Sequence, residues 1–188
     1  MTIRVASAKD AEPLAKLVLL AIQDIAYQLT GQSNEAGVLE QLEKFIAAAG
    51  NRFSADCFLV EVNEYKPAGM ILCYHGRDAQ RLYQPVIDHL KQVTGDPDVQ
   101  IDQEADEDEY YIDAVAVDPA FQGRGVAKML ISAAERRAMD RGYDKIALNV
   151  DQANDIAHSL YRKLGYAADK EITIHHKPYW HMTKALTE

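Results

Sequence analysis

The sequence predicts an α+β fold, because segments typical of strands and segments typical of amphipathic helices alternate along its 188 residues. A capping signal at Ser7 precedes a long helical repeat, and two apolar strand-like runs occur at residues 57–62 and 68–75. At residues 113–130 an alternating apolar segment meets a turn, two glycines and another helical pattern. A hydrophobic content of 48% is enough for one domain with a real core.

The first elements are a short strand and a helix. Residues 3–6 form the expected strand, and "SAKD" then matches a capping box in which Ser7 caps free amides while Asp10 reaches back. The following helix presents one apolar stripe, made of Leu14, Leu17, Val18, Ala21, Ile22 and Ile25. A second helix is expected at residues 38–49.

The next elements are two strands and a segment of different character. Residues 57–62 ("CFLVEV") and 68–75 ("AGMILCYH") predict antiparallel strands joined by a short turn. We interpret residues 75–109 as an insertion, which contains an amphipathic helix broken near Pro85 and then an acidic run at 102–109. Such a run is either a solvated loop or a means of attracting a cationic amine.

The remainder of the chain alternates strands with helices and contains no internal repeat. The expected elements are a strand at 110–117, a helix at 127–141, a strand at 145–150, a helix at 154–164 and closing strands at 171–176 and 179–186. We therefore expect residues 1–188 to form a single domain, with the insertion at about 75–109.

Composition limits the partners of this protein. Twenty basic and 29 acidic residues give a formal net charge of −9, which disfavours binding to nucleic acid or to an anionic membrane. Cys57 and Cys73 lie in apolar runs without metal-ligand spacing, so we expect buried thiols. No secretion signal and no apolar run of roughly 20 residues is present. We expect a cytoplasmic protein that does not enter membranes.

The junction at residues 113–130 is typical of an anion site. The first amides of a helix lack internal partners, and Gly123 and Gly125 let the backbone approach a ligand while Arg124 adds a cation. A phosphate or pyrophosphate is the expected guest. The dinucleotide pattern G-x-G-x-x-G is incomplete, and the Gly-Lys-Ser/Thr ending of a nucleoside-triphosphate loop is missing. A turn that merely ends the strand is the alternative.

Two motifs define a family resemblance. "AVDPAFQGRGVAKMLI" carries the pattern Gln/Arg-x-x-Gly-x-Gly/Ala from Gln122 to Ala127, and "NVDQANDIAHSLYRKLGY" follows with Asn154, Tyr161 and Leu-Gly-Tyr. Together they resemble the GNAT superfamily of N-acetyltransferases, specifically over residues 110–166 and more loosely over 2–30. The resemblance implies a mixed, mostly antiparallel twisted sheet flanked by helices, with splayed central strands.

The resemblance also implies a mode of binding acetyl-coenzyme A. In this family the pantetheine arm pairs with the strand before the turn, here Ala114 to Val117 with Val115 and Val117. The pyrophosphate is held by main-chain amides, here those of Gln122, Gly123, Arg124, Gly125, Val126 and Ala127. The Arg124 side chain either contacts the cofactor or is a solvated cation. Asn154 is either a cofactor contact or the N-cap of its helix.

Catalytic roles follow from the same resemblance. Tyr161 occupies the position of the usual general acid, although it also lies in an apolar helical stripe and could be a core residue. Asp113 is the candidate base, acting through a water, and its structural alternative is a satisfied carboxylate at a strand bulge. A glutamate would be the commoner family choice at position 111, where this chain has Tyr111.

We expect direct transfer of acetyl to a primary amine of a small molecule. The alternatives are a peptide or protein lysine or N-terminal acetyltransferase, and a non-catalytic sensor that binds acyl-coenzyme A. No metal is expected, because His175 and His176 would point to opposite strand faces and no carboxylate-rich spacing accompanies them or His181. The insertion is the candidate substrate lid, and the closing strands could pair two chains as a homodimer.

Overall fold

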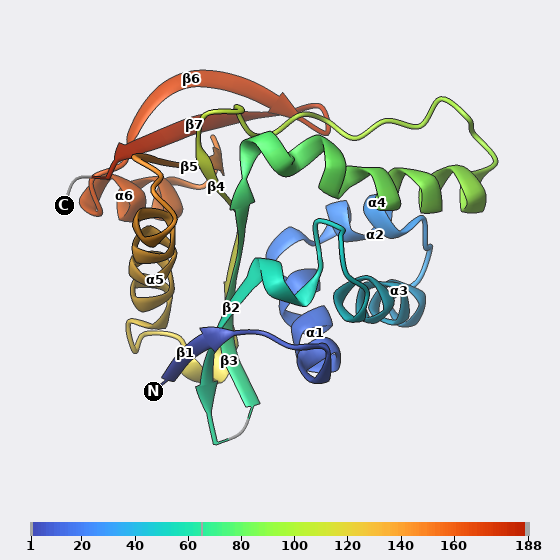
Figure 1. Ribbon diagram of the computed structural model, residues 1–188, viewed down its shortest axis with the longest axis horizontal. Helices are drawn as coiled ribbons and strands as arrows, with labels where there is room; N and C mark the ends of the chain where they lie inside the picture. The colour runs from blue at the N-terminus through green and yellow to red at the C-terminus, as the bar shows by residue number, and fades with distance from the viewer. Residues whose placement is uncertain (1, 65, 187–188) are drawn as a thin grey trace.

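The computed structural model describes residues 2–64 and 66–186, which form a seven-stranded sheet between two layers of helices (Figure 1). The strand order is β1-β2-β3-β4-β5-β7-β6. Neighbouring strands are antiparallel except β4 and β5, which are parallel. The strands are β1 (Thr2–Val5), β2 (Phe58–Asn63), β3 (Lys66–His75), β4 (Tyr110–Val117), β5 (Lys145–Asp151), β6 (Ala167–Ile174) and β7 (Lys177–Ala185). The predicted α+β class and mixed, mostly antiparallel sheet are confirmed.

Helices cover both faces of the sheet. The helices are α1 (Ala11–Ile22), α2 (Asp24–Thr30), α3 (Glu35–Ala47), α4 (Ala79–Thr94), α5 (Val126–Asp140) and α6 (Asp155–Lys163). Figure 1 shows α1 to α4 on one side, with α5 and α6 on the other. One core lies under each layer. Residues 67–75 of β3 are buried on both faces, which explains why "AGMILCYH" is a continuous apolar run.

The first helical repeat forms two helices rather than the single one predicted. Gln23, between α1 and α2, has a φ of 45°, which a right-handed helix cannot accommodate. Ile25 of α2 nevertheless packs against the same core as α1, so the apolar stripe continues across the break. Upstream, the Ser7 amide donates to Oδ2 of Asp10 at 2.8 Å, as the capping signal predicts.

The central strands separate part-way along their length. β4 pairs with β5 only from Tyr110 to Ile112, opposite Ile146 to Leu148. Among residues 2–64 and 66–186, no strand lies beside this edge of β4 beyond Ile112. On its other edge β4 remains paired with β3, with a register shift that leaves Asp113 between Ile112 and Ala114. The splayed central strands implied by the resemblance are therefore present.

The segment at residues 75–109 contributes to the core, and its interpretation as an insertion stays a prediction. Helix α4 buries Leu82, Tyr83, Val86 and Leu90 in the core beneath α1 and α3. The helix is also continuous through Pro85, contrary to the predicted break. Pro85 lies on the exposed face, where water can satisfy the carbonyl that loses its intrahelical partner.

Two further expectations concern the cysteines and membranes. Cys57 and Cys73 are free and buried, as predicted. Burial raises the pKa of Cys57 to about 12, so this thiol stays protonated. Over residues 2–64 and 66–186, no helix has the length and apolar character needed to cross a bilayer.

Candidate active site

A cavity of about 360 Å³ opens where β4 and β5 separate. Its walls come from β4, β5, the α1–α2 junction, Arg52, the loop before β4, α6 and the β6–β7 hairpin. The cavity therefore lies between elements that are far apart in the sequence, and the missing strand pairing creates it.

The turn after β4 presents unpaired amides. Gly123 and Gly125 have φ values of 74° and 79°, a region that L side chains rarely adopt. Within the described residues, the amides of Gly123, Arg124 and Gly125 donate no hydrogen bond to the protein. Val126 then begins a 15-residue helix, whose first amides also lack internal acceptors. This concave run of donors at a helix amino terminus can hold a phosphate group.

Side chains around the turn leave those amides accessible. The Gln122 side chain donates to the carbonyl of Val117 at 3.2 Å and ties the turn to the end of β4. The exposed Arg124 guanidinium lies 5.2 Å from the centre of the Phe121 ring. The Val126 side chain is buried in the core, while Ala127 is half-buried on the first turn of α5. Only the main chain of Val126 is therefore placed to contact a ligand.

The predicted residues on β4 and α6 meet at the same cavity. Val115 lines it from the β4 edge that has no neighbouring strand, and Val117 is half-buried two residues further along. Asn154 lines the cavity as well, and its Oδ1 accepts from the Ala157 amide at 3.0 Å. The N-cap interpretation of Asn154 is confirmed, while a cofactor contact stays a prediction.

Tyr161 lies on α6 and lines the cavity from the side of β5. Its ring packs edge-on against Tyr166, with centroids 5.8 Å apart, so the apolar packing noted in the sequence is real. Burial raises the pKa of Tyr161 to about 12. The phenol therefore keeps its proton across the physiological range and is available as a donor.

Asp113, the predicted base, is held in a buried ion pair. Arg52 donates through Nε to Oδ2 of Asp113 at 2.9 Å and through Nη2 to Oδ1 at 2.8 Å. The Tyr74 hydroxyl donates to Oδ2 at 2.8 Å. Both carboxylate oxygens are thus engaged at the strand bulge, which favours the structural alternative for Asp113.

Glu104 is the second carboxylate of this cluster and reaches the cavity from the acidic run. It accepts from Arg52 Nη2 at 3.1 Å and from the Tyr111 hydroxyl at 3.0 Å. Asn149 of β5 donates both to the Glu104 carbonyl and to the Tyr111 hydroxyl, each at 2.9 Å. Burial raises the pKa of Glu104, because one guanidinium serves two buried carboxylates and its opposing effect is smaller.

The acidic run at residues 102–109 is individually partnered rather than freely solvated. Besides Glu104, the contacts are Asp102 with the His175 amide at 2.9 Å, Asp106 with Lys170 at 2.6 Å, Asp108 with Lys145 at 2.8 Å and Glu109 with His181 at 3.1 Å. Gly76 allows this loop to approach β3, since a Cβ there would lie 1.7 Å from the Asp106 carbonyl. The run therefore fastens the loop to the sheet, and its charges are largely compensated.

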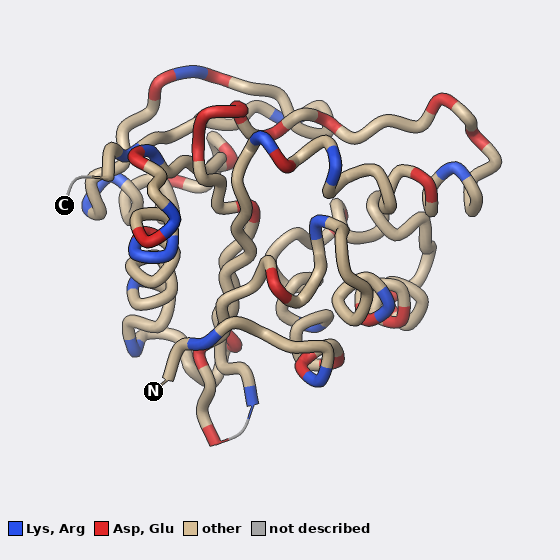
Figure 2. Tube along the Cα trace, viewed as in Figure 1, with Lys and Arg blue, Asp and Glu red and all other residues tan. Residues whose placement is uncertain are grey.

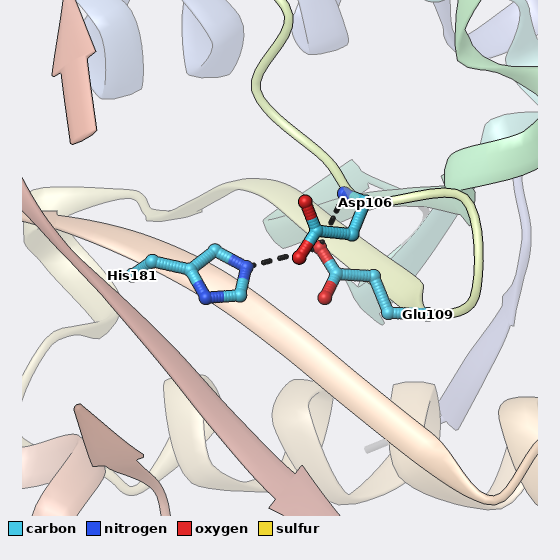
Figure 3. A group of neighbouring side chains, drawn as sticks. All are labelled: Asp106, Glu109 and His181. Atoms are coloured by element: carbon cyan, nitrogen blue, oxygen red, sulfur yellow. Dashed lines mark hydrogen bonds and ion pairs between the residues drawn. The ribbon is translucent and has the colours of Figure 1, made fainter. Parts of the chain in front are cut away.

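Figure 3 shows Asp106, Glu109 and His181 converging within this network. Nε2 of His181 faces Glu109, and its Nδ1 lies 2.6 Å from Asp169. Hydrogen bonds to these two carboxylates outweigh the effect of burial and raise the pKa of His181. Ligand atoms of Asp106, Glu109 and His181 lie within 4.8 Å of one another, a spacing that could hold a metal ion, so the expected absence of a metal stays a prediction.

Comparison with known proteins identifies the family. Residues 22–166 match the model of the acetyltransferase (GNAT) family. The chain belongs to this family. The GNAT resemblance drawn from the glycine turn and the α6 motif is thereby confirmed, as is the expected class of acyltransferase.

Individual GNAT relatives are similar over different lengths. The [ribosomal protein bS18]-alanine N-acetyltransferase of Haemophilus ducreyi is 40% identical over 72 residues, which are 38% of this chain and 48% of that protein. The chain thus matches about half the length of this curated relative. Among solved structures, an acetyltransferase is 27% identical with a TM-score of 0.84, and each chain is covered over 100%. The N-acetyltransferase from Staphylococcus aureus Mu50 is also 27% identical, with a TM-score of 0.81, over 97% of this chain and 100% of that one.

Two site residues could not be found from the sequence. Arg52 lies in the connection between α3 and β2, and Glu104 lies inside a run of eight mostly acidic residues. Neither occupies a motif, and only the fold brings them to Asp113. One sequence signal was available. The run "DQEADEDE" is interrupted by a glutamine and an alanine, and Ala105 is buried beside Glu104.

Proposed function

We propose that this protein transfers an acetyl group from acetyl-coenzyme A directly to a primary amine. The observation that supports this most is a convergence at one cavity. Val115 on the unpaired edge of β4 and the Tyr161 phenol both line it, and the open turn at Gly123–Gly125 follows at the end of the same strand. When bound, acetyl-coenzyme A would supply the thioester-linked acetyl group.

The cofactor would be held mainly by the main chain. The β4 edge at Val115 and Val117 has no neighbouring strand and would pair with an extended amide-containing arm. The amides from Gln122 to Ala127 would receive the pyrophosphate, and Arg124 would add a cation at its edge. Asn154 would contact the arm from the opposite wall.

Tyr161 is the proposed general acid. As the amine nitrogen attacks the carbonyl carbon and the carbon–sulfur bond breaks, the phenol gives its proton to the departing sulfur. Its position in the cavity and its protonated state support this role. The tyrosinate left behind regains a proton from solvent.

The proton lost by the amine is assigned to Glu104 rather than Asp113. Both side chains line the cavity, and Asp113 accepts three hydrogen bonds, from the Arg52 fork and Tyr74, whereas Glu104 accepts two, one from Arg52 and one from Tyr111. Burial raises the pKa of Glu104 toward the operating pH, where a carboxylate is a more effective base. In this proposal Asp113 fixes Arg52, and Arg52 fixes Glu104.

The acceptor is a primary amine, and a small molecule is our first candidate. The cavity is of the size that ordinarily holds a small ligand. A peptide amino terminus is the second candidate, because one relative is an alanine N-acetyltransferase acting on a ribosomal protein. A cytoplasmic location and a homodimer stay predictions.

The deciding experiment is calorimetric titration with acetyl-coenzyme A, without amine. Binding with Kd below about 1 mM supports the cofactor assignment, and absence of binding by folded protein overturns it. Turnover is then measured on polyamines, amino acids, aminoglycosides and alanine-starting peptides. Activity only on peptides replaces the small-molecule candidate. Tight binding with no turnover on any of these acceptors favours the acyl-coenzyme A sensor.

A further inference from the structure

A second cavity, of about 210 Å³, lies at the carboxyl-terminal end of α5. It shares no lining residue with the cavity at the β4–β5 split. The glycine turn precedes the first residue of α5, whereas Arg137 and Arg141 line the second cavity near its last residue. A helix of this length is about 22 Å long, so the two sites are well separated.

The cavity contains cationic side chains without carboxylate partners. Arg137 donates through Nη2 to the Asp56 main-chain carbonyl at 2.6 Å, while its Nη1 is buried without a hydrogen-bond partner. Arg141 forms no ion pair within the described residues.

Arg137 lies in the last turn of α5, and Arg141 is the C-cap of that helix, four residues further along the chain. Residues four apart in a helix are neighbours, and like charges at this spacing repel each other. Figure 2 shows basic and acidic residues together near the carboxyl-terminal end of α5. An anion between Arg137 and Arg141 would remove the repulsion and satisfy the free guanidinium nitrogen.

The other walls of the cavity are mixed. Asp56 lines it without an ion pair in the part of the chain that the structure describes and opposes an anion, whereas the remaining groups do not. Arg81 lines it from α4 and is paired with Asp78 at 3.2 Å, so the Asp78 charge is already compensated. His75 and Tyr143 stack with ring centroids 4.2 Å apart and form one side. Cys73 also lines the cavity, and burial raises its pKa, so the thiol adds no negative charge.

We propose that this second cavity binds a small phosphate-type dianion between Arg137 and Arg141. Guanidinium groups bind tetrahedral oxyanions through paired hydrogen bonds, and two converging cations match a double negative charge. The volume is below that of a site for a drug-sized ligand, so the guest is a free phosphate or a short phosphate monoester. The site is independent of the proposed acetyl transfer.

Inorganic phosphate is the probe, titrated calorimetrically at constant ionic strength so that screening of surface charges does not change. We expect Kd below about 1 mM for the intact protein. Arg141→Gln should weaken binding about tenfold or more, since one charge-assisted contact is lost. Arg137→Gln together with Arg141→Gln should abolish it. Arg136→Gln, at an exposed position beside them on α5, is the matched control and should bind normally.

Arg137 also holds the Asp56 carbonyl, so the double variant could lose stability. Arg141→Gln breaks no such contact, so a loss of phosphate binding in this variant is not caused by lost stability. Phosphate could alternatively occupy the glycine turn, and in that case the arginine variants would bind unchanged, which overturns the proposal. Kd above about 10 mM for the intact protein overturns it too.

Malonate in place of phosphate tests the ligand class, because tighter binding of malonate would reject a phosphate site. Glycerol 3-phosphate then distinguishes a monoester guest from free phosphate.

Discussion

At the residue scale, the environment of each ionisable side chain decides its chemistry. Asp113 and Glu104 are both buried carboxylates beside Arg52, yet Asp113 takes two of the guanidinium hydrogen bonds and Glu104 takes one. One guanidinium and two carboxylates leave this buried cluster with a net negative charge, which favours a proton on one carboxylate. The raised pKa of Glu104 expresses that imbalance.

Replacing Tyr161 with phenylalanine tests the general acid. We expect Tyr161→Phe to lower kcat about 100-fold, because the departing sulfur loses its proton donor. Acetyl-coenzyme A affinity should be little changed. Tyr166→Phe is the control, since the Tyr166 hydroxyl donates to Glu135 and its loss should reduce stability while sparing turnover. Equal kcat values for Tyr161→Phe and the intact enzyme would remove Tyr161 from the chemistry.

Replacing Glu104 with glutamine tests the base. We expect Glu104→Gln to lower kcat/KM about 100-fold and to abolish its rise with pH on the acidic side. The raised pKa of Glu104 places that rise above the ordinary carboxyl range. Glu107→Gln is the control, because Glu107 is an exposed residue of the same acidic run. A pH profile that survives in Glu104→Gln would assign the base elsewhere.

At the element scale, helix α5 and the turn before it depend on glycine conformation. The left-handed φ values of Gly123 and Gly125 aim successive amides into one concavity. The acidic loop before β4 depends instead on charge, since its carboxylates are matched to residues of β5, β6 and β7 and to Arg52. One element is thus shaped by backbone sterics and the other by ion pairs.

Alanine substitutions in the turn should affect both stability and ligand binding. A Cβ at a left-handed position costs about 1 kcal/mol, so Gly123→Ala and Gly125→Ala should each lower the free energy of unfolding by that amount. Both should also weaken acetyl-coenzyme A binding in calorimetry. Gly142→Ala is the matched control, because Gly142 has the same φ of 79° as Gly125 but lies beyond the other end of α5. If all three variants bind the cofactor equally, the turn is not its site.

The histidine that fastens the loop to β7 should make stability depend on pH. The pKa of His181 is raised in the folded state by hydrogen bonds to Glu109 and Asp169. Its contribution is therefore fully present below the unfolded pKa of about 6.5 and is lost as pH rises through the folded pKa. Urea unfolding from pH 6 to 9 should show this decline, and His181→Gln should lack it. His75 and His175 have lowered pKa values, which make stability rise with pH instead. The contribution of His181 is therefore the difference in unfolding free energy between the intact protein and His181→Gln at each pH. If the unfolding free energies of the intact protein and His181→Gln change with pH in parallel, the ion pairs of His181 do not make stability depend on pH.

At the scale of the whole molecule, the sheet separates two cores and is itself split between β4 and β5. Helices α1 to α4 cover one face and α5 covers the other, so each face is closed by different parts of the chain. The active-site cavity lies where the sheet opens, and the loop carrying Glu104 reaches it from the α4 side. Segment 75–109 is consequently part of both the core and the site.

Two deletions within residues 75–109 should differ in their effect on folding. Deleting α4 should prevent folding, because four large buried side chains would leave the core. Removing Gly95–Asp98, which is exposed throughout, should leave the thermal midpoint and acetyl-coenzyme A affinity nearly unchanged. Circular dichroism melts and calorimetry check both variants. A folded protein lacking α4 would show that the core does not depend on this helix.

Local signals in the sequence determined the elements, the glycine turn and the family. Strand β4 was predicted at its observed bounds and the helix after the turn to within one residue, since these depend on alternation, glycine and helix capping within a few positions. The residues proposed for the cofactor are also contiguous, which is why a motif could indicate them.

Only the tertiary structure decided which ionisable side chains surround the cavity, how the acidic run is paired and where the first helical repeat breaks, at Gln23. Arg52, Glu104 and Asp113 come from three distant segments, so their contacts depend on how the chain packs. A run of carboxylates looks alike in sequence whether it is solvated or paired, because its partners Lys145, Lys170 and His181 lie 37 to 72 residues away. The periodicity of apolar residues indicates which residues face the core. The pKa of a side chain, and its use in catalysis, depend on its neighbours in the folded protein.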